Sequence, residues 1–331
     1  MNILIIGAGA VGLVYGYHFS NAGHKVTFLV KEKYQRPLEQ DKQEGVVLYH
    51  LNKDKALAKP IRFRNFDVMS DWNQTNRFDL VALAISSNAL RQLPLDKLKD
   101  KLQLKTEAAA THASLLMLQP SQKDFEHLSQ IIPTTQILQG MISLISYQTD
   151  EINRAIQPLG TAYYLPPLPM PISATDALEQ RNHRANIVKL FNDAGIKAKA
   201  VHSAVSDSRL PSAFLMTFLC ALEAANWNFN QLRNSPELLS QLSQAQRALL
   251  PPQLSQTGLF LPLKKVILSS LLKPWLYKLL LRIAPVFVPL PLEAYLKKHF
   301  LKVRPQTMMY MQEYEEQHPS RAITNLLSLI R

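Results

Sequence analysis

The sequence has a single cysteine, Cys220, among 331 residues. One thiol forms no intrachain disulfide, which excludes the disulfide-stapled class of secreted domains and suits a reducing compartment. No stretch of about twenty predominantly apolar residues is present, because the uncharged run over 128–149 is interrupted by Gln, Ser, Thr, Pro and Gly. The N-terminus lacks the basic region of a secretory signal peptide. We therefore expect a cytoplasmic globular protein.

Three further absences narrow the function. The sequence shows no recognised nucleic-acid-binding module, no internal repeat and no spacing of His, Cys, Asp and Glu that is typical of a metal site. The chain is nevertheless basic, with a formal net charge of +12, and from residue 250 onward it has 11 basic against 4 acidic residues. Excess positive charge attracts anionic partners of any kind. We expect no metal and no nucleic acid as a partner, and look instead for an anionic cofactor, a small anionic substrate or a membrane surface.

The most specific motif lies at the N-terminus. A short apolar run, residues 3–6, is followed by a G-x-G-x-x-G motif formed by Gly7, Ala8, Gly9, Ala10, Val11 and Gly12. Between a strand and a helix, the first glycine allows the tight turn, the second lets a pyrophosphate approach the backbone, and the third lets the helix pack closely. A helix over 13–22 and a strand over 25–30 complete a βαβ unit. The motif predicts a dinucleotide-binding domain in which this loop holds the cofactor phosphates.

The end of the second strand bears on the choice of cofactor. An acidic residue there binds the ribose 2′-hydroxyl of NAD, whereas a basic residue accommodates the 2′-phosphate of NADP. Lys31 closes the predicted strand and Glu32 follows it, with Lys33 and Arg36 nearby. The excess of positive charge favours NADP(H) as the cofactor and Lys31 as its 2′-phosphate ligand. The alternatives are NAD bound through Glu32, or a Lys31 that is only a solvated strand-end lysine.

The chain divides into two regions of different pattern. Up to about residue 203, strand-like apolar runs alternate with helical segments, which is typical of a doubly wound parallel sheet. Beyond residue 204 the strand signals vanish and helical periodicity takes over, with prolines at positions suited to first turns. We predict an α/β fold in which residues 1–203 form a Rossmann-type dinucleotide-binding domain. Residues 204–331 are predicted to form an all-helical domain for substrate binding or dimerisation.

On these features the chain resembles the ketopantoate reductase (2-dehydropantoate 2-reductase) family. The resemblance rests on the glycine motif, on Gly23-His24-Lys25-Val26 ahead of the basic Lys31, and on the order of the two domains. It covers most of the chain in architecture, and mainly the first thirty residues in specific motifs. It implies a dinucleotide-binding domain followed by a helical domain, and reduction of ketopantoate to pantoate with NADPH.

The catalytic positions depart from the family pattern. Where the family has a cofactor-contacting lysine after its fourth strand and an asparagine after its fifth, this chain has Ser86 and Gln119, which we assign to the cofactor site. Where the family has a lysine general acid and two asparagines on its first C-terminal helix, this chain has Ser212, Met216 and Cys220. Reduction of a keto group creates an alkoxide that needs a proton donor. Met216 donates no proton, and Ser212 is a poor acid near neutral pH.

Other residues are candidates to replace the missing groups. His299, Lys302, Gln306 and Glu313 are spaced by three, four and seven, which would align them on one face of a continuous helix. Lys302 is then the candidate acid or carboxylate ligand, and Glu313 the candidate residue facing the cofactor. Pro305 argues against a continuous helix, because an interior proline costs about 3 kcal/mol. The alternative is a polar helix face with solvated charges.

The segment 259–296 interleaves aliphatic residues with Lys, Arg, Trp and Tyr, and contains no acid before Glu293. This composition suits packing on the protein's own core or on a second copy in a homodimer, with lysine stems covering apolar surface. It also suits an amphipathic helix at an anionic membrane surface. Taken together, the sequence predicts an NADPH-dependent reductase of a small keto acid or related carbonyl compound. The rival hypothesis is a non-catalytic NADP(H)-binding protein that has lost its catalytic set.

Overall fold

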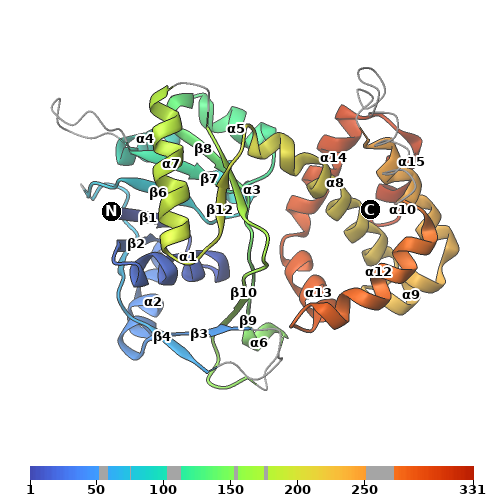
Figure 1. Cartoon of the computed structure of the whole chain (residues 1–331), viewed down its shortest axis with the longest axis horizontal. Helices are drawn as coiled ribbons and strands as arrows, with labels where there is room; N and C mark the ends of the chain where they lie inside the picture. Colours follow the sequence, from blue (N-terminus) through green and yellow to red (C-terminus); the bar gives the residue numbers. More distant parts are fainter. Residues whose placement is uncertain (52–58, 75, 103–112, 153–155, 175–177, 251–271) are drawn as a thin grey trace. The chain divides into compact units, whose positions relative to one another are not determined.

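The computed structural model describes residues 1–51, 59–74, 76–102, 113–152, 156–174, 178–250 and 272–331 (Figure 1). These residues form two compact units, one within residues 1–208 and the other within residues 209–331. The first unit is mixed α/β and the second is helical, so the predicted fold class is confirmed. The assignment of residues 1–203 to the cofactor and of residues 204–331 to substrate or dimer contacts stays a prediction.

An eight-stranded sheet forms the centre of the first unit. Its order is β12 (Ala198–Ala200), β11 (Met170–Ser173), β8 (Ile137–Gly140), β7 (Ser114–Met117), β6 (Leu80–Leu83), β1 (Asn2–Ile6), β2 (Lys25–Leu29) and β5 (Asp67–Met69). The strands from β8 to β5 run parallel to their neighbours, and β11 is antiparallel to β8. The chain leaves β1 for β2 on one side and returns to β6 on the other. Loops at the carboxyl ends of the parallel strands therefore meet at one edge around β1.

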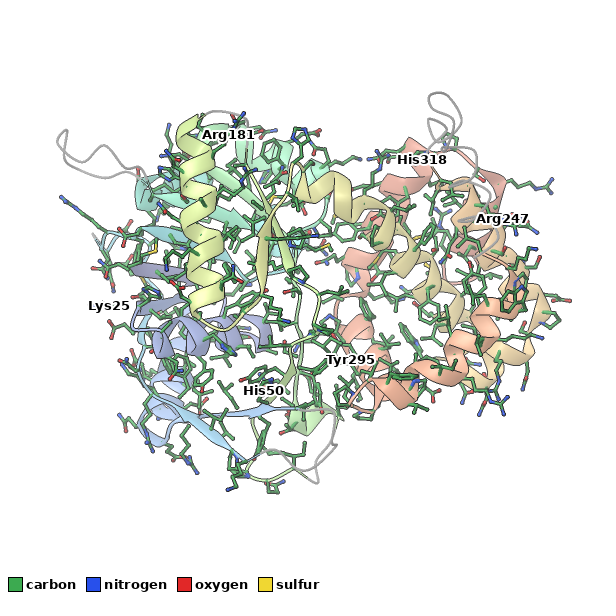
Figure 2. All side chains as sticks on the ribbon, viewed as in Figure 1. Lys25, His50, Arg181, Arg247, Tyr295 and His318 are labelled. Carbon is green, nitrogen blue, oxygen red and sulfur yellow. The ribbon has the colours of Figure 1, made fainter. Side chains whose placement is uncertain are left out.

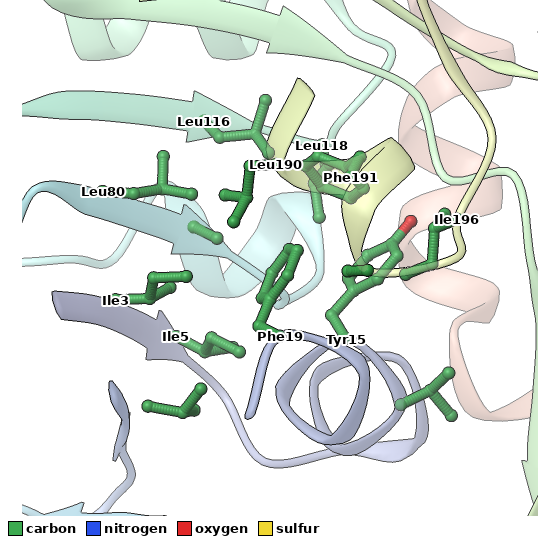
Figure 3. Close-up of a cluster of buried hydrophobic side chains, with 14 of the residues drawn as sticks. Ile3, Ile5, Tyr15, Phe19, Leu80, Leu116, Leu118, Leu190, Phe191 and Ile196 are labelled. Atoms are coloured by element: carbon green, nitrogen blue, oxygen red, sulfur yellow. The ribbon is translucent and has the colours of Figure 1, made fainter. Parts of the chain in front are cut away.

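Both faces of this sheet are buried, which explains the continuous apolar runs of its strands. Because side chains alternate along a strand, Ile3 and Ile5 face one cluster, which includes Tyr15 and Phe19 of α1 (Ala10–Asn21) and Phe191 of α7 (Leu178–Asp193) (Figure 3). The rings of Phe19 and Phe191 meet edge to face, with centroids 5.0 Å apart. Leu4 and Ile6 face the other cluster, with residues of α3 (Ser87–Leu90), α4 (Leu95–Leu102) and α5 (Gln122–Ser129).

A second sheet separates from the first, which the sequence pattern did not predict. It has the order β4 (Ile61–Phe63), β3 (Val46–His50), β10 (Thr161–Tyr164) and β9 (Ile145–Gln148). The apolar stretch over 137–148 forms two strands, β8 and β9, which lie in different sheets. His50, at the end of β3, stacks on Tyr163 of β10 with ring centroids 4.8 Å apart (Figure 2). Short elements at η1 (Thr134–Gln136) and α6 (Thr149–Ile152) complete the connections.

The polar stretch after β2 forms a helix, α2 (Glu32–Glu44), of which only Leu38 is buried. Gly45, with φ of +88°, ends it, and Arg62 and Arg64 donate hydrogen bonds to the carbonyl oxygen of Glu44 at 3.0 and 2.8 Å. Residues 175–177, just before α7, lie outside the described residues.

Helices build the second unit around one apolar cluster. They are α8 (Ala204–Ala224), which begins in the first unit, α9 (Phe229–Asn234), α10 (Pro236–Ala248), α12 (Pro274–Phe287), α13 (Leu292–Lys302), α14 (Arg304–Gln317) and α15 (Arg321–Ser328). Proline occupies the first turn of α10, α12 and α14, as predicted. Pro211 is an exception, because it lies inside α8. Residues 251–271, before α12, lie outside the described part of the chain.

Candidate active site

The glycine loop links β1 to α1 at the carboxyl edge of the large sheet. Gly7 has φ of +102°, and a Cβ there would lie 2.8 Å from the carbonyl oxygen of Ala84. A Cβ on Gly12 would lie 2.0 Å from the carbonyl oxygen of Gly7, so the start of the helix packs directly on the turn. The fold itself therefore requires glycine at these two positions.

Gly9 is different. Its φ of −76° and ψ of −175° are open to any residue, and a Cβ at this position meets no atom within 4 Å. Gly9 is the residue before the first turn of α1, where Ala10, Val11 and Gly12 present backbone N–H groups that have no partner within the helix. No contact within the described residues explains a glycine here. An external group that approaches the backbone does explain it.

Lys31 and Glu32 lie at the same edge, one strand away, because β2 runs parallel to β1. Lys31 is the exposed residue that precedes α2, and Glu32 is in the first turn of that helix. A carboxylate in a first helical turn is stabilised by the helix dipole, so Glu32 has a structural reason to be acidic. Lys31 is a donor only and makes no capping hydrogen bond to α2.

Ser86 and Gln119 follow β6 and β7 at this edge, and both side chains bind the backbone. The Ser86 hydroxyl caps α3 by accepting the N–H of Ala89 at 3.3 Å. Gln119 is buried, and its Nε2 donates to the carbonyl oxygens of Leu83 and Ile85 at 3.1 and 2.6 Å. Its Oε1 accepts the N–H of Leu118 at 3.1 Å. Gln119 thus fixes the ends of two neighbouring strands against each other.

A buried polar cluster beside these loops was missed by the sequence reasoning. The Ser87 hydroxyl donates to Asp124 Oδ2 at 2.5 Å, and Arg91 Nε donates to Asp124 Oδ1 at 2.7 Å. Asp124 is fully buried in the first turn of α5, after the capping Ser121. The cluster ties the helix after β6 to the helix after β7. Ser121 and Asp124 are spaced as in a helix-capping pattern, and this spacing is the feature of the sequence that could have indicated the start of α5.

An apolar cavity of about 380 Å³ opens at the carboxyl end of β8. The register of β11 against β8 and of β12 against β11 brings together Met141, Pro171 and Lys199, which line this cavity. Ile142, Ser143, Leu144, Ile145, Pro166, Leu168, Pro169 and Val201 complete the lining. Because β8 is parallel to the strands up to β1, the cavity belongs to the same edge of the sheet as the glycine loop. No motif in the sequence marks this cavity.

In the second unit, the positions aligned with the family's catalytic residues are packed into the interior. Ser212 on α8 is buried and accepts a hydrogen bond from the Tyr314 hydroxyl at 3.0 Å. Met216 is buried one turn further on. Cys220 is fully buried, and this burial raises the pKa of its thiol to about 12. None of the three side chains supplies an acid for a keto group near neutral pH.

Lys302 and Glu313 do not lie on one continuous helix. Lys302 ends α13, Val303 breaks the helical conformation with φ of −104° and ψ of 18°, and Arg304 begins α14. The predicted alignment on one continuous helix is therefore wrong, because a new helix begins at Arg304 with Pro305 in its first turn. Lys302 is exposed in the last turn of α13, whereas Glu313 is buried within α14. Their catalytic assignment stays a prediction.

Glu223, another polar residue of α8, has a partner within the second unit. It accepts a hydrogen bond from Arg304 Nε at 2.7 Å, and Arg304 also donates to the carbonyl oxygen of Ile330. Among the described residues, no group of three or more His, Cys, Asp or Glu side chains is arranged to hold a metal ion.

The sheet order and the glycine loop define the first unit as a Rossmann-type domain, here followed by a helical domain. Comparison with known proteins supports the family resemblance for the first part of the chain. The family model "Ketopantoate reductase PanE/ApbA" matches residues 3–163, so this part of the chain is a ketopantoate reductase-family domain and the resemblance drawn from the sequence is confirmed. No curated protein sequence matches the chain significantly.

Solved structures share the fold along nearly the whole chain. The 2-dehydropantoate 2-reductase from Geobacter metallireducens GS-15 is 15% identical with a TM-score of 0.64, covering 100% of this chain and 99% of that chain. D-mandelate dehydrogenase in its ternary structure with NADH and anilino(oxo)acetate is 12% identical with a TM-score of 0.65, covering 99% and 97%. A probable 2-dehydropantoate 2-reductase from Bacillus subtilis is 14% identical with a TM-score of 0.58, covering 99% and 98%.

Proposed function

We propose that the protein is a nicotinamide-dinucleotide-dependent reductase of small keto acids, with NADPH as its cofactor. The observation that carries this proposal is the open space at Gly9. The fold requires glycine at positions 7 and 12, but nothing in the described part of the chain requires it at position 9. A cofactor pyrophosphate seated on the first N–H groups of α1 accounts for that glycine. The match of this segment to the ketopantoate reductase family supports the same cofactor class.

The preference for NADPH rests on Lys31. Lys31 is exposed at the carboxyl end of β2, where a dinucleotide places its adenosine ribose. Its ammonium group suits a 2′-phosphate, and Glu32 is accounted for by the dipole of α2. When bound, the reduced nicotinamide supplies the hydride for the carbonyl group. The chain supplies the binding and the orientation of both molecules.

The cavity at the end of β8 suggests the substrate class. Its walls are mostly aliphatic and proline side chains, with Lys199 as a charged group. An aliphatic or aromatic substituent of a keto acid suits such walls, and the lysine suits its carboxylate. This arrangement favours keto acids with a bulky apolar substituent over pyruvate. D-mandelate dehydrogenase, a structural neighbour, was solved with a ligand that carries an aromatic group beside an oxoacetate.

A second candidate function is cofactor binding without catalysis. The observation that favours it is the interior position of Ser212, Met216 and Cys220, which leaves the family's proton-donor positions without a usable acid. Loss of a general acid typically lowers the rate 10²- to 10⁴-fold. A protein of this kind would bind NADPH as tightly as the reductase but would turn over no keto acid.

NADPH oxidation separates the two functions. We expect turnover with phenylglyoxylate or a branched keto acid, and weaker turnover with pyruvate or ketopantoate. Ile142→Asp, in the cavity wall, should lower kcat/KM for the apolar substrates without changing the Kd for NADPH. Ile131→Asp is the matched control, since Ile131 is similarly exposed and does not line the cavity. Tight NADPH binding with no turnover on any keto acid would establish the second function, and absence of NADPH binding would refute both.

A further inference from the structure

The outer face of α12 carries an apolar stripe that is exposed in this structure. Trp275, Leu279, Arg282 and Val286 are spaced by four, three and four residues, so they lie along one side of the helix. Trp275 is 59% exposed, Leu279 43% and Val286 66%. Exposed tryptophan and aliphatic side chains in one row are unusual for a surface helix. The exposed Phe287 continues this patch at the end of the helix.

The inner face of α12 is firmly fixed, so the helix cannot turn its apolar stripe inward. Tyr277 and Leu281 lie on the opposite side and are buried in the core of the second unit. The Tyr277 hydroxyl donates a hydrogen bond to Gln246 Oε1 at 2.6 Å, and both groups are buried. Rotating the helix would break this hydrogen bond and remove two side chains from the core. The outward stripe is therefore a property of the folded unit.

Positive charge accompanies the apolar stripe. Lys273, Lys278 and Arg282 are exposed on or directly before α12, and Lys297, Lys298 and Lys302 are exposed on α13. The single acid between residues 272 and 304 is Glu293, whose Oε1 accepts the backbone N–H of Phe229 at 2.8 Å. The surface thus combines apolar side chains with cations and almost no negative charge.

We infer that this α12–α13 surface binds the surface of an anionic phospholipid bilayer. Tryptophan and aliphatic side chains enter the headgroup region, while the stems of lysine and arginine extend to lipid phosphates. A second copy of the chain fits less well. A two-fold interface would bring the cations of both copies together, with Glu293 as the single acid of the α12–α13 segment in each copy.

The geometry supports binding at the interface rather than a membrane crossing. Within the described residues, no single helix is long and apolar enough to cross a bilayer. The pair α12 and α13 together reaches the required length and composition, but it bends by 100°. A helix of fourteen residues is about 21 Å long, against a hydrocarbon core of about 30 Å. This proposal concerns the second unit only and does not depend on the proposed reductase activity.

Flotation of the full-length protein with lipid vesicles tests the inference. We expect the protein to float with vesicles of phosphatidylcholine and phosphatidylserine, to float poorly with phosphatidylcholine alone, and to be released by high salt. One basic residue near an anionic surface raises the partition coefficient about five-fold. Lys278→Gln/Arg282→Gln should therefore lower it about thirty-fold. The control Lys97→Gln/Arg321→Gln removes the same net charge from exposed residues elsewhere and should have little effect.

A second pair of matched variants tests the contribution of apolar side chains to vesicle binding. Leu279 and Leu329 are both 43% exposed, but only Leu279 lies on the stripe. We expect Leu279→Ser to weaken vesicle binding and Leu329→Ser to leave it unchanged. The fluorescence of the unmodified protein should shift to the blue on anionic vesicles, and Trp275→Phe should abolish the shift while flotation persists.

Several outcomes would overturn the inference. Equal losses in both members of either matched pair would show that net charge or general hydrophobicity, rather than α12, governs binding. A blue shift that persists in Trp275→Phe would place the contact near another tryptophan. A vesicle-free dimer that Leu279→Ser dissociates, without vesicle binding, would assign the surface to a second copy.

Discussion

The glycine loop allows a prediction in which two substitutions, three residues apart, impair different properties, one the binding of NADPH and the other the stability of the fold. Gly9→Val places its side chain in open space, and the backbone at this position already has an ordinary extended conformation. Valine is a poorer residue than glycine before a helix, so we expect a stability loss of at most about 1 kcal/mol. Its side chain would occupy the position proposed for the pyrophosphate. Losing two charge-assisted hydrogen bonds, each contributing about 1.5–3 kcal/mol, should raise the Kd for NADPH at least about 100-fold.

Gly12→Ala should act on the fold. The added Cβ would lie 2.0 Å from the carbonyl oxygen of Gly7, so α1 must move away from the strand end. Overpacking of this kind costs about 1–3 kcal/mol, and each kcal/mol lowers the Tm by about 2–4 °C for a unit of this size. Gly12→Ala should therefore lose stability, whereas Gly9→Val should lose mainly binding.

Thermal unfolding by circular dichroism and NADPH titration by calorimetry measure the two effects separately. The NADPH titration is informative only if the Gly9→Val variant is folded. If this variant melts within a few degrees of the parent and binds NADPH with the parent's Kd, no pyrophosphate approaches position 9. The proposed cofactor site would then be wrong.

Three further predictions follow from single contacts. Lys31→Ala should raise the Kd for NADPH about ten-fold or more and leave the Kd for NADH nearly unchanged. If the parent protein instead binds NADH more tightly than NADPH, and Glu32→Gln removes this preference, the cofactor assignment is reversed. Burial lowers the pKa of His18, whose Nδ1 donates to a backbone carbonyl at 2.9 Å, while its buried Nε2 has no hydrogen-bond partner among the described residues. The folded state thus favours the neutral ring, so the free energy of unfolding measured in urea should be full above pH 6.5 and fall as the pH drops below it. His18→Leu should flatten this fall, and an unchanged pH dependence in the variant would contradict the prediction. Arg304→Met should destabilise the second unit by about 1–2 kcal/mol because it leaves Glu223, which is only 18% exposed, without its cation, and unaltered urea unfolding would show that the pair contributes nothing.

The first βαβ unit could be predicted because its determinants are local. Gly7 is needed for a turn with φ of +102°, and Gly12 is needed for the close contact between the start of α1 and the strand end. Each requirement concerns one residue type at one position, so it can be recognised in the sequence. The alternation of buried side chains along β1 and β6 likewise follows from the sequence, since both sheet faces are covered. The break before α14 was signalled by Pro305 for the same local reason.

The second sheet, by contrast, depends on pairings that no local pattern encodes. Residues 48–50 pair in parallel with residues 161–163, more than a hundred positions later. The strand pattern of these segments predicted strands but not their partners. Only the folded chain shows that β8 and β9, a few residues apart, lie in different sheets.

The candidate site shows the same division between local and non-local determinants. The sequence by itself determined the glycine loop and its place at the end of β1, because glycine's conformational freedom is a property of one residue. Only the tertiary structure decided that Gln119 holds two strand ends together, that Ser212 binds Tyr314 and that Met216 and Cys220 lie in the core. Gln119 binds the carbonyl oxygen of Leu83, 36 residues away in the sequence, and Ser212 binds Tyr314, 102 residues away. A polar side chain has the same letter in the sequence whether it faces a ligand or a neighbouring carbonyl, and only packing chooses between them.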